Sequence, residues 1–265
     1  MARRHLGDPA GTQRIRPTPG LLEFAIMILT LLGAGASKGL VADLQAGFTT
    51  ATGAGLTTFF GAAGLIREKV LAGEACDVVI LTGAYLDELG ARGLLAGPAV
   101  PIGLTRTGVA VPAGQPVPDI ATSDSLRAAL LAARGVYVPD PLVSTAGIHV
   151  MRVLRDLGIE REVQPHLRPF PNGATAMRQL AAAPEANAVG CTQITEITYT
   201  PGLTLAGPLP AAHGLATVYA AAVRAGTAHP AAAQALVALL TGPASRERRE
   251  AGGFEPLAAT AAGGA

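Results

Sequence analysis

The chain of 265 residues contains no tryptophan, and only 4% of its residues are aromatic and 15% are charged. Its formal net charge is +1, and its basic residues are scattered, which gives no electrostatic case for a nucleic-acid partner. It also lacks any run of about 18 or more apolar residues, which argues against a transmembrane helix. We therefore expect neither nucleic-acid binding nor insertion into a membrane.

Cysteine is scarce as well, because Cys76 and Cys191 are the only two. Each lies in or beside an apolar, strand-like run, which favours small buried hydrophobic residues over redox or metal-binding groups. The sequence has no CxxC motif, no cluster of histidines and no glycine-rich loop that carries the Lys-Ser/Thr pair of a nucleotide site. We expect no metal and no other cofactor.

What the chain does have is 49% hydrophobic residues together with 33 glycines and 20 prolines, which is typical of α/β proteins with short connections. An apolar run at Ile26–Leu32 is followed by a turn of small residues at 33–36 and then by an amphipathic helix. This order is typical of a buried parallel strand feeding a helix, and Ser37 stands where the helix N-cap belongs. The same pattern recurs at 61–64, 144–147 and 172–174.

Two interpretations of the N-terminus remain open. Residues 1–20 are polar and indicate a flexible tail. The apolar run that follows, together with the sequence AGA at 34–36, resembles a secretory signal and its cleavage site. Glu23 interrupts this run, and cleavage at 34–36 would remove the first strand, so we favour the strand over the signal peptide.

Breaks in composition at 104–108 and 199–202 indicate two crossings between lobes. We predict lobe one at 21–104 plus 203–256, lobe two at 105–202 and a low-complexity tail at 257–265. Two α/β lobes joined in this way form a cleft, and open α/β sheets bind ligands at the carboxyl ends of their strands. The four small-residue turns would line that cleft, where the free N–H groups of helix starts favour an anion.

Four segments of the chain carry a resemblance to a known family. They are GAGASKGL at 33–40, GAAGLIREKVLAGEACDVVILT at 61–82, DPLVSTAGIHVMRVLRDLGI at 140–159 and VGCTQITE at 189–196. Together they resemble the molybdate-type substrate-binding proteins of ABC transporters. The resemblance implies the type II periplasmic-binding-protein fold, in which two lobes, each a mostly parallel sheet flanked by helices, close about a hinge around a small anion.

The resemblance also implies an ABC permease as a partner and a periplasmic or other extracytoplasmic location. A cytoplasmic location remains the alternative, because the sequence has no clean signal peptide. We expect a monomer.

By the same resemblance, the expected ligand contacts are small or polar residues at the four turns and at one strand end. They are Ala36, Ser37, Ala62, Ala63, Gly64, Thr145, Ala146, Asn172, Gly173, Ala174 and Gln193. Ser37 corresponds to the family's first-turn serine. The second turn lacks the family's serine and offers only backbone N–H donors, and Gln193 replaces the tyrosine that commonly closes the site.

These departures change the expected ligand, because a buried ligand oxygen without its donor costs about 1–3 kcal/mol. The loss argues against molybdate or tungstate and favours an organic carboxylate that uses Gln193 and Asn172. The leading hypothesis is a solute-binding protein that holds a small anion, either an oxyanion or an organic carboxylate, in an interlobe cleft for an ABC importer. The alternative is an isomerase of an unsaturated polycarboxylate, because this branch of the fold is also similar to bacterial aconitate isomerase.

Three titratable residues near the turns are assigned no catalytic role. Asp140 stands between two prolines and is assigned to turn capping. His149 lies one residue past the apolar face of its helix and indicates a hydrogen-bonded helix residue. The run 188–197 indicates a strand, and Glu196, at its end, is expected to lie beyond the edge of the cleft.

Overall fold

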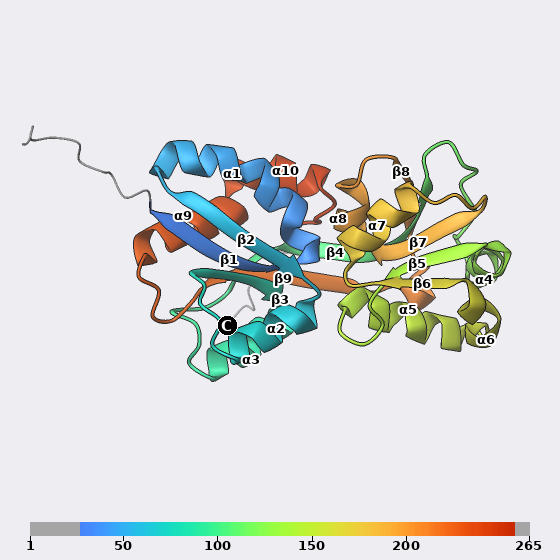
Figure 1. The fold of residues 1–265 in the computed structure, drawn as a ribbon, viewed down its shortest axis with the longest axis horizontal. Coiled ribbons are helices and arrows are strands. Elements are labelled where there is room, and N and C mark those ends of the chain that lie inside the picture. Colours follow the sequence, from blue (N-terminus) through green and yellow to red (C-terminus); the bar gives the residue numbers. More distant parts are fainter. Residues whose placement is uncertain (1–26, 258–265) are drawn as a thin grey trace, which may run out of the picture.

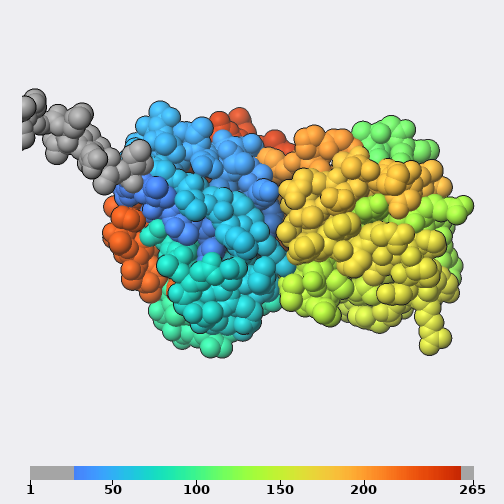
Figure 2. All heavy atoms as spheres, in the orientation of Figure 1, coloured from blue at the N-terminus to red at the C-terminus, as the bar shows by residue number. Residues whose placement is uncertain are grey.

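The computed structural model describes residues 27–257, which form two α/β lobes lying side by side (Figure 1). Strands alternate with helices in both lobes, as the sequence predicted. Figure 2 shows the lobes in contact along a narrow seam. The predicted tail at 1–20 lies outside the described residues, as does the tail at 257–265 apart from Leu257.

The first lobe is built on a sheet with the order β2-β1-β3-β9-β4, in which β1, β2 and β3 are parallel and β9 is antiparallel to both of its neighbours. Its strands are β1 (Ile28–Ala34), β2 (Gly55–Gly61), β3 (Val78–Thr82), β9 (Ala216–Val223) and the first part of β4 (Val100–Pro112). Its helices are η1 (Gly35–Ser37), α1 (Lys38–Thr52), α2 (Ala63–Leu71), α3 (Gly83–Ala91), α9 (Pro230–Thr241), η4 (Pro243–Ser245) and α10 (Arg246–Ala251). All five residues of β3 are buried, as expected for a central strand covered on both faces.

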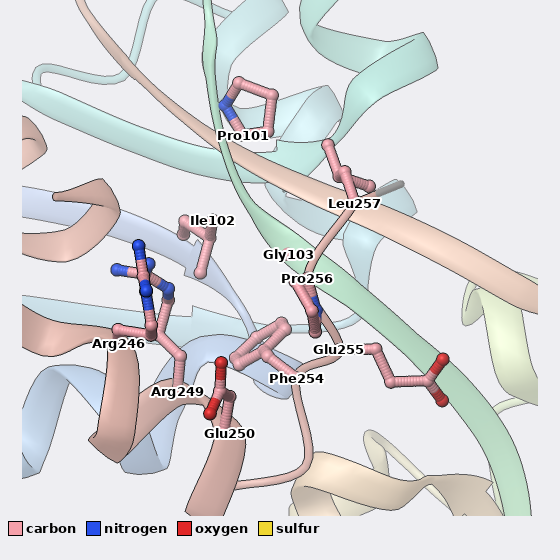
Figure 3. A pocket seen from close by; sticks show the side chains of 10 residues that line it. All are labelled: Pro101, Ile102, Gly103, Arg246, Arg249, Glu250, Phe254, Glu255, Pro256 and Leu257. Carbon is pink, nitrogen blue, oxygen red and sulfur yellow. The ribbon is translucent and has the colours of Figure 1, made fainter. Parts of the chain in front are cut away.

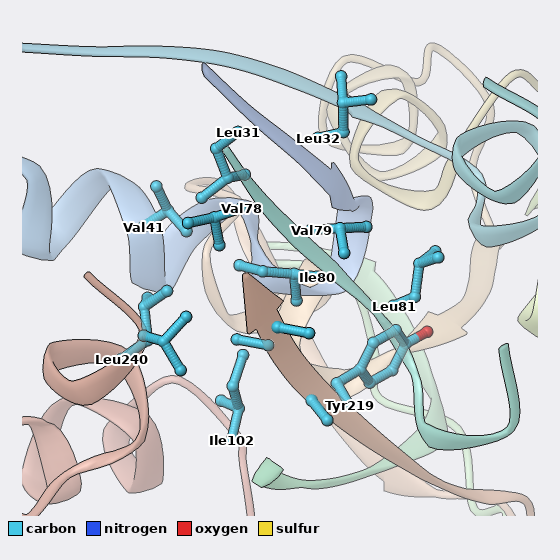
Figure 4. Packing of buried hydrophobic residues seen from close by; sticks show 14 of the residues in the cluster. Leu31, Leu32, Val41, Val78, Val79, Ile80, Leu81, Ile102, Tyr219 and Leu240 are labelled. Atoms are coloured by element: carbon cyan, nitrogen blue, oxygen red, sulfur yellow. The ribbon is translucent and has the colours of Figure 1, made fainter. Parts of the chain in front are cut away.

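Apolar side chains from the sheet and its helices form the core of this lobe (Figure 4). Leu31 of β1 and Val78 and Ile80 of β3 belong to the same buried cluster as Val41 of α1 and Leu240 of α9. Burying a side chain of this size contributes about 1.5–3 kcal/mol. The strand ends that carry the small-residue turns are therefore held on a tightly packed support.

The second lobe repeats the pattern of strand, turn and helix around the order β8-β4-β7-β5-β6. Its strands are β5 (Gly135–Pro139), β6 (Leu167–Phe170), β7 (Ala188–Gln193), β8 (Leu203–Pro208) and the last part of β4. Its helices are α4 (Ser123–Ala132), α5 (Thr145–Asp156), α6 (Glu160–Val163), η2 (Gln164–His166), α7 (Gly173–Ala181) and α8 (Ile194–Thr198), and η3 (Ala211–His213) follows β8. Two buried clusters, one containing Leu126 and Leu154 and the other Met177 and Leu180, stabilise this sheet.

The long strand β4 connects the two lobes. Arg106 pairs with Ala216 of β9 in the first sheet, whereas the next residue, Thr107, pairs with Gln193 of β7 in the second. This change of partner lies within the crossing predicted at 104–108. The ladder of hydrogen bonds continues through β4, so one path of paired strands runs from the outer strand of one lobe to that of the other.

The return to lobe one lies later in the chain than the sequence indicated. We expected a crossing at 199–202 and assigned 203–256 to lobe one. Instead β8 pairs with Gly108–Pro112 of β4 in the second sheet, and the chain crosses back between Pro208 and Ala216. The break at 199–202 follows the end of α8 at Thr198, and Gly202 turns the chain there with φ +83°. The assignment of β8 to lobe one is wrong, because turn residues mark a helix end and a crossing alike.

Candidate functional site

Carboxyl ends of parallel strands from both lobes meet at the seam, around a cavity of about 10 Å³. Lobe one lines this cavity with Ala34, Gly35, Ala36, Gly61, Ala62, Ala63 and Tyr219. Lobe two lines it with Ser144, Thr145, Ala146, Asn172, Gly173, Gln193 and Glu196. Most of these residues belong to turns between a strand and the following helix, so four helix starts meet at one place.

The structure brings together most of the residues that were predicted to contact a ligand. Those that line the cavity are Ala36, Ala62, Ala63, Thr145, Ala146, Asn172, Gly173 and Gln193. Ser37, Gly64 and Ala174 follow lining residues in the chain but do not line the cavity themselves. The prediction that these residues bind a ligand remains a prediction.

The prediction that Ser37 caps helix α1 is wrong. The chain leaves β1 through the short helix η1, and Ser37 has helical backbone angles, with φ −94° and ψ −7°, and makes no side-chain cap bond. Its hydroxyl is fully buried and donates instead to the carbonyl oxygen of Ala34 at 2.8 Å. An N-cap needs extended backbone to bring its side chain over the free N–H groups, whereas a helical turn directs a serine back to an earlier carbonyl.

Two of the expected backbone donors are already hydrogen-bonded within the protein. The N–H of Gly64 donates to the carbonyl oxygen of Val143 at 3.1 Å, which joins helix α2 of lobe one to the loop before α5 in lobe two. The N–H of Ala174 donates to a carboxylate oxygen of Glu196 at 3.2 Å. A side chain at position 64 would place its Cβ 2.8 Å from the Val143 oxygen, so this close approach of the lobes requires glycine.

The side-chain amides of Asn172 and Gln193 differ in which of their polar atoms are already hydrogen-bonded within the protein. The Asn172 side chain caps helix α7 by accepting from the N–H of Thr175 at 2.9 Å. Gln193 is 2% exposed and donates from Nε2 to Thr217 Oγ1 at 3.4 Å. Its Oε1 has no hydrogen-bond partner among residues 27–257. An unpaired buried polar atom costs about 1–3 kcal/mol, so Gln193 offers the cavity an unpaired acceptor for a ligand hydroxyl, besides the second N–H of its amide as a donor.

Glu196 belongs to the site, although the sequence predicted it beyond the edge of the cleft. It lies in the wall of the cavity and is 7% exposed, not beyond the edge of the cleft. Strand β7 ends at Gln193 and the chain turns into the short helix α8, which carries the carboxyl group back over the cavity. There it accepts hydrogen bonds from Thr192 Oγ1 at 2.5 Å and from the N–H of Ala174 at 3.2 Å.

The environment of Glu196 disfavours its charged form. Burial raises the pKa of Glu196 to about 7, against the hydrogen bonds from Thr192, Ala174 and Gln193, which lower it. Side chains at Gly35 of lobe one or Gly173 of lobe two would collide with the carboxyl oxygens. The carboxyl group therefore occupies a space that glycines from both lobes leave open.

Tyr219 was also missed, and it reaches the cavity from β9 of lobe one. It is 3% exposed, and its pKa is raised mainly by burial and further by the nearby Glu196. Gln193 replaces the family's tyrosine on β7, but the structure supplies a phenol from the opposite lobe. Only the pairing of β9 with β3 and β4 brings Tyr219 here, and no local motif marks it.

A larger cavity of about 460 Å³ lies in lobe one, between the start of β4 and the segment that follows α10 (Figure 3). Arg249 in its wall donates to the carbonyl oxygens of Leu240 at 3.1 Å and Gly242 at 2.7 Å. The guanidinium thus serves the end of helix α9, and the sequence places none of the predicted contacts here.

Residues 27–257 contain neither a candidate metal cluster nor a candidate membrane span. Within this range, no three His, Cys, Asp or Glu side chains gather in a way that could hold a metal ion. Within the same range, none of the helices combines the length and the apolar character needed to span a bilayer.

Comparisons with known proteins agree with this geometry. A family model described as bacterial extracellular solute-binding protein matches residues 29–255. The chain is 27% identical to an aconitate isomerase from Pseudomonas sp. over 256 residues, which cover 94% of this chain and 95% of that protein.

Solved structures show the same fold. The Azotobacter vinelandii periplasmic molybdate-binding protein superposes with a TM-score of 0.70 at 19% identity, covering 86% of this chain and 98% of that one. The sulfate-binding protein SubI from Mycobacterium tuberculosis H37Rv superposes with a TM-score of 0.66 at 17% identity, covering 87% of each chain. These likenesses confirm the predicted type II periplasmic-binding-protein fold. Because the family model spans most of the sequence, the chain belongs to the bacterial extracellular solute-binding protein family.

Proposed function

We propose that this protein reversibly binds a small anionic solute in the seam cavity and delivers it to an ABC permease outside the cytoplasm. The observation that supports this most is the meeting of four helix starts, from both lobes, at one cavity. Free N–H groups and helix dipoles favour an anion at such a place. No Lys or Arg is among the described residues that line the cavity, so neutral dipoles would hold the anion and still release it.

The polar groups of the cavity favour an organic carboxylate over a tetrahedral oxyanion. The turn at Ala62 and Ala63 offers no hydroxyl, whereas Thr145, Asn172 and Gln193 offer side-chain donors. A volume of about 10 Å³ holds about one water molecule, so a ligand requires the lobes to separate before it enters.

The proposed hinge for this separation lies where the chain crosses between the lobes. Strand β4 changes sheets between Arg106 and Thr107, and the return segment at 209–215 is hydrogen-bonded to Thr107 at both ends, with two bonds of 3.0 Å. Rotation about these two adjacent segments would open the cavity without breaking either core. We propose that the protein works in this way as a monomer.

Calorimetry and thermal shift against molybdate, tungstate, sulfate and a panel of di- and tricarboxylates test the proposal. We expect heat and a raised melting temperature with a carboxylate. Gln193→Ala should weaken this binding, whereas Gln179→Ala, which removes an exposed amide from α7, should not. No heat and no shift with every anion would count against binding as the function.

A second function, isomerisation of an unsaturated polycarboxylate, is favoured by the buried Glu196 carboxyl in the cavity wall. The aconitate isomerase relative, similar over nearly its full length, supports the same idea. A 1,3-proton shift needs an acid–base group beside donors that stabilise an enolate, and the helix starts would supply those donors. NMR of cis- and trans-aconitate with the protein tests this, and unchanged spectra after long incubation would reject it.

A further inference from the structure

The Glu196 carboxyl occupies hydrogen-bond donors that an anionic ligand would otherwise use. The N-terminus of helix α7 is one of the four helix starts at the cavity, and its Ala174 N–H is bonded to Glu196 Oε1 at 3.2 Å. The second oxygen accepts from the Thr192 hydroxyl at 2.5 Å. The protein thus places a carboxylate of its own at its candidate anion site.

Within the part of the chain that the structure describes, no Lys, Arg or His forms an ion pair with this carboxyl group. The titratable or charged side chains on elements packed against Glu196 are Tyr219 of β9, Tyr199 at the end of its own helix, the buried thiol Cys191 of β7, Lys38 and Asp43 of α1, Arg178 of α7 and Arg106 of β4. The α1 and α7 side chains are exposed, and Arg106 pairs with Glu255 at 2.8 Å.

Glu196 also has a route to solvent on its outer side. Besides the cavity, it lines a groove of about 340 Å³ between α1 and the α7–α8 region. The groove is open and includes the exposed charges of Lys38 and Arg178. A proton can therefore reach the carboxyl group from water without passing through the closed seam.

We propose that Glu196 determines which charge state of the site accepts a ligand, so that an anionic group binds only together with one proton that Glu196 takes up from solvent. This inference rests on the proposed function. A charged Glu196 would face the ligand with a like charge in a space with little water. The protonated carboxyl, by contrast, donates a hydrogen bond to the ligand. The Thr192 hydroxyl, which donates to the charged carboxylate, can then rotate to suit the protonated group.

The chemistry of the site is consistent with uptake near neutral pH. Burial already holds the pKa of Glu196 at about 7 without a ligand. A second negative charge beside it disfavours the carboxylate further, so the complex should keep the proton where the free protein has lost it. Affinity should then fall as the pH rises, although the ligand itself stays fully ionised.

Titration calorimetry with trans-aconitate and with molybdate tests this, at about pH 6 and about pH 8, in buffers of different ionisation enthalpy. Above about pH 7 we expect Kd to rise about tenfold per pH unit, with uptake of close to one proton per anion at about pH 8. Glu196→Gln, neutral at every pH, should show the same Kd at both values and no proton uptake. As a control, Glu185→Gln should behave as wild type. Glu185 lies outside the cavity, and its carboxylate accepts a hydrogen bond from the Tyr137 hydroxyl.

The outcomes separate this inference from the proposed function. Binding with equal Kd at both pH values and no proton uptake overturns the inference and leaves anion binding in place. No binding of either anion at either pH overturns the proposed function and this inference with it. If Glu196→Gln fails to fold, the proton count of the wild-type protein decides alone.

Discussion

Replacing Glu196 with glutamine should remove a penalty on stability that appears only as the pH rises. Burial raises the pKa of Glu196 from 4.5 to about 7 in the folded protein. The folded state therefore holds this proton more tightly than the unfolded chain. The contribution of this proton to the free energy of unfolding is fully present below about pH 4.5 and is lost as the pH rises to about 7. The difference in pKa corresponds to about 3 kcal/mol for this buried group.

Urea unfolding at a series of pH values from about 4.5 to about 8 measures this effect. The free energy of unfolding of the wild type, minus that of Glu196→Gln, should fall by about 3 kcal/mol across this range and then level off. Glutamine keeps an oxygen for the Ala174 N–H, so the variant tests the charge and not the shape of the side chain.

A second substitution gives the reasoning an independent check. The Thr192 hydroxyl donates to Glu196 and lowers its pKa, so Thr192→Val should move the upper end of the transition to higher pH. A difference between wild type and Glu196→Gln that stays constant with pH would refute the argument, because it would show that the carboxyl has the same proton affinity in the folded and unfolded states.

Further predictions concern the small residues around the seam. Ser37→Ala should lower the free energy of unfolding by about 1 kcal/mol, through the lost hydrogen bond and not through a lost cap, as urea unfolding would show. Gly173→Ala, whose Cβ would collide with the buried carboxyl, should destabilise by about 1–3 kcal/mol in the same assay. Gly39→Ala should lower the melting temperature because its Cβ would overlap the ring of Tyr199 from the other lobe. Gly47→Ala on the same helix meets open space, so it should raise the free energy of unfolding by about 0.5–1 kcal/mol.

Local, repeated signals were sufficient to predict two α/β lobes, whereas the type II arrangement of these lobes was implied by the resemblance to a known family. Each buried strand, small-residue turn and amphipathic helix can be recognised within about 25 residues, and the alternation of these units indicates an α/β fold. Strand β8 could not be placed in the same way. Its partner is Gly108–Pro112, almost a hundred positions earlier, and turn residues do not say which sheet the chain enters next.

The candidate site shows the same division between local and long-range information. The turns that line it were found because glycine and alanine before a helix are a local pattern. The carboxyl of Glu196 was not, because the five-residue helix α8 is too short to show a period and a continued strand fits the same letters.

The group that fills the space beside a small residue can come from a distant part of the chain. Gly35 and Gly173 indicate that something approaches the backbone closely, and a ligand was the expected occupant. In the structure the occupant is the side chain of Glu196, which stands between a turn of one lobe and a turn of the other. A glycine-rich turn therefore predicts a close neighbour but not its charge. Here that neighbour is acidic, which makes the protonation of one carboxyl, rather than the number of free N–H groups, the first quantity to measure at this site.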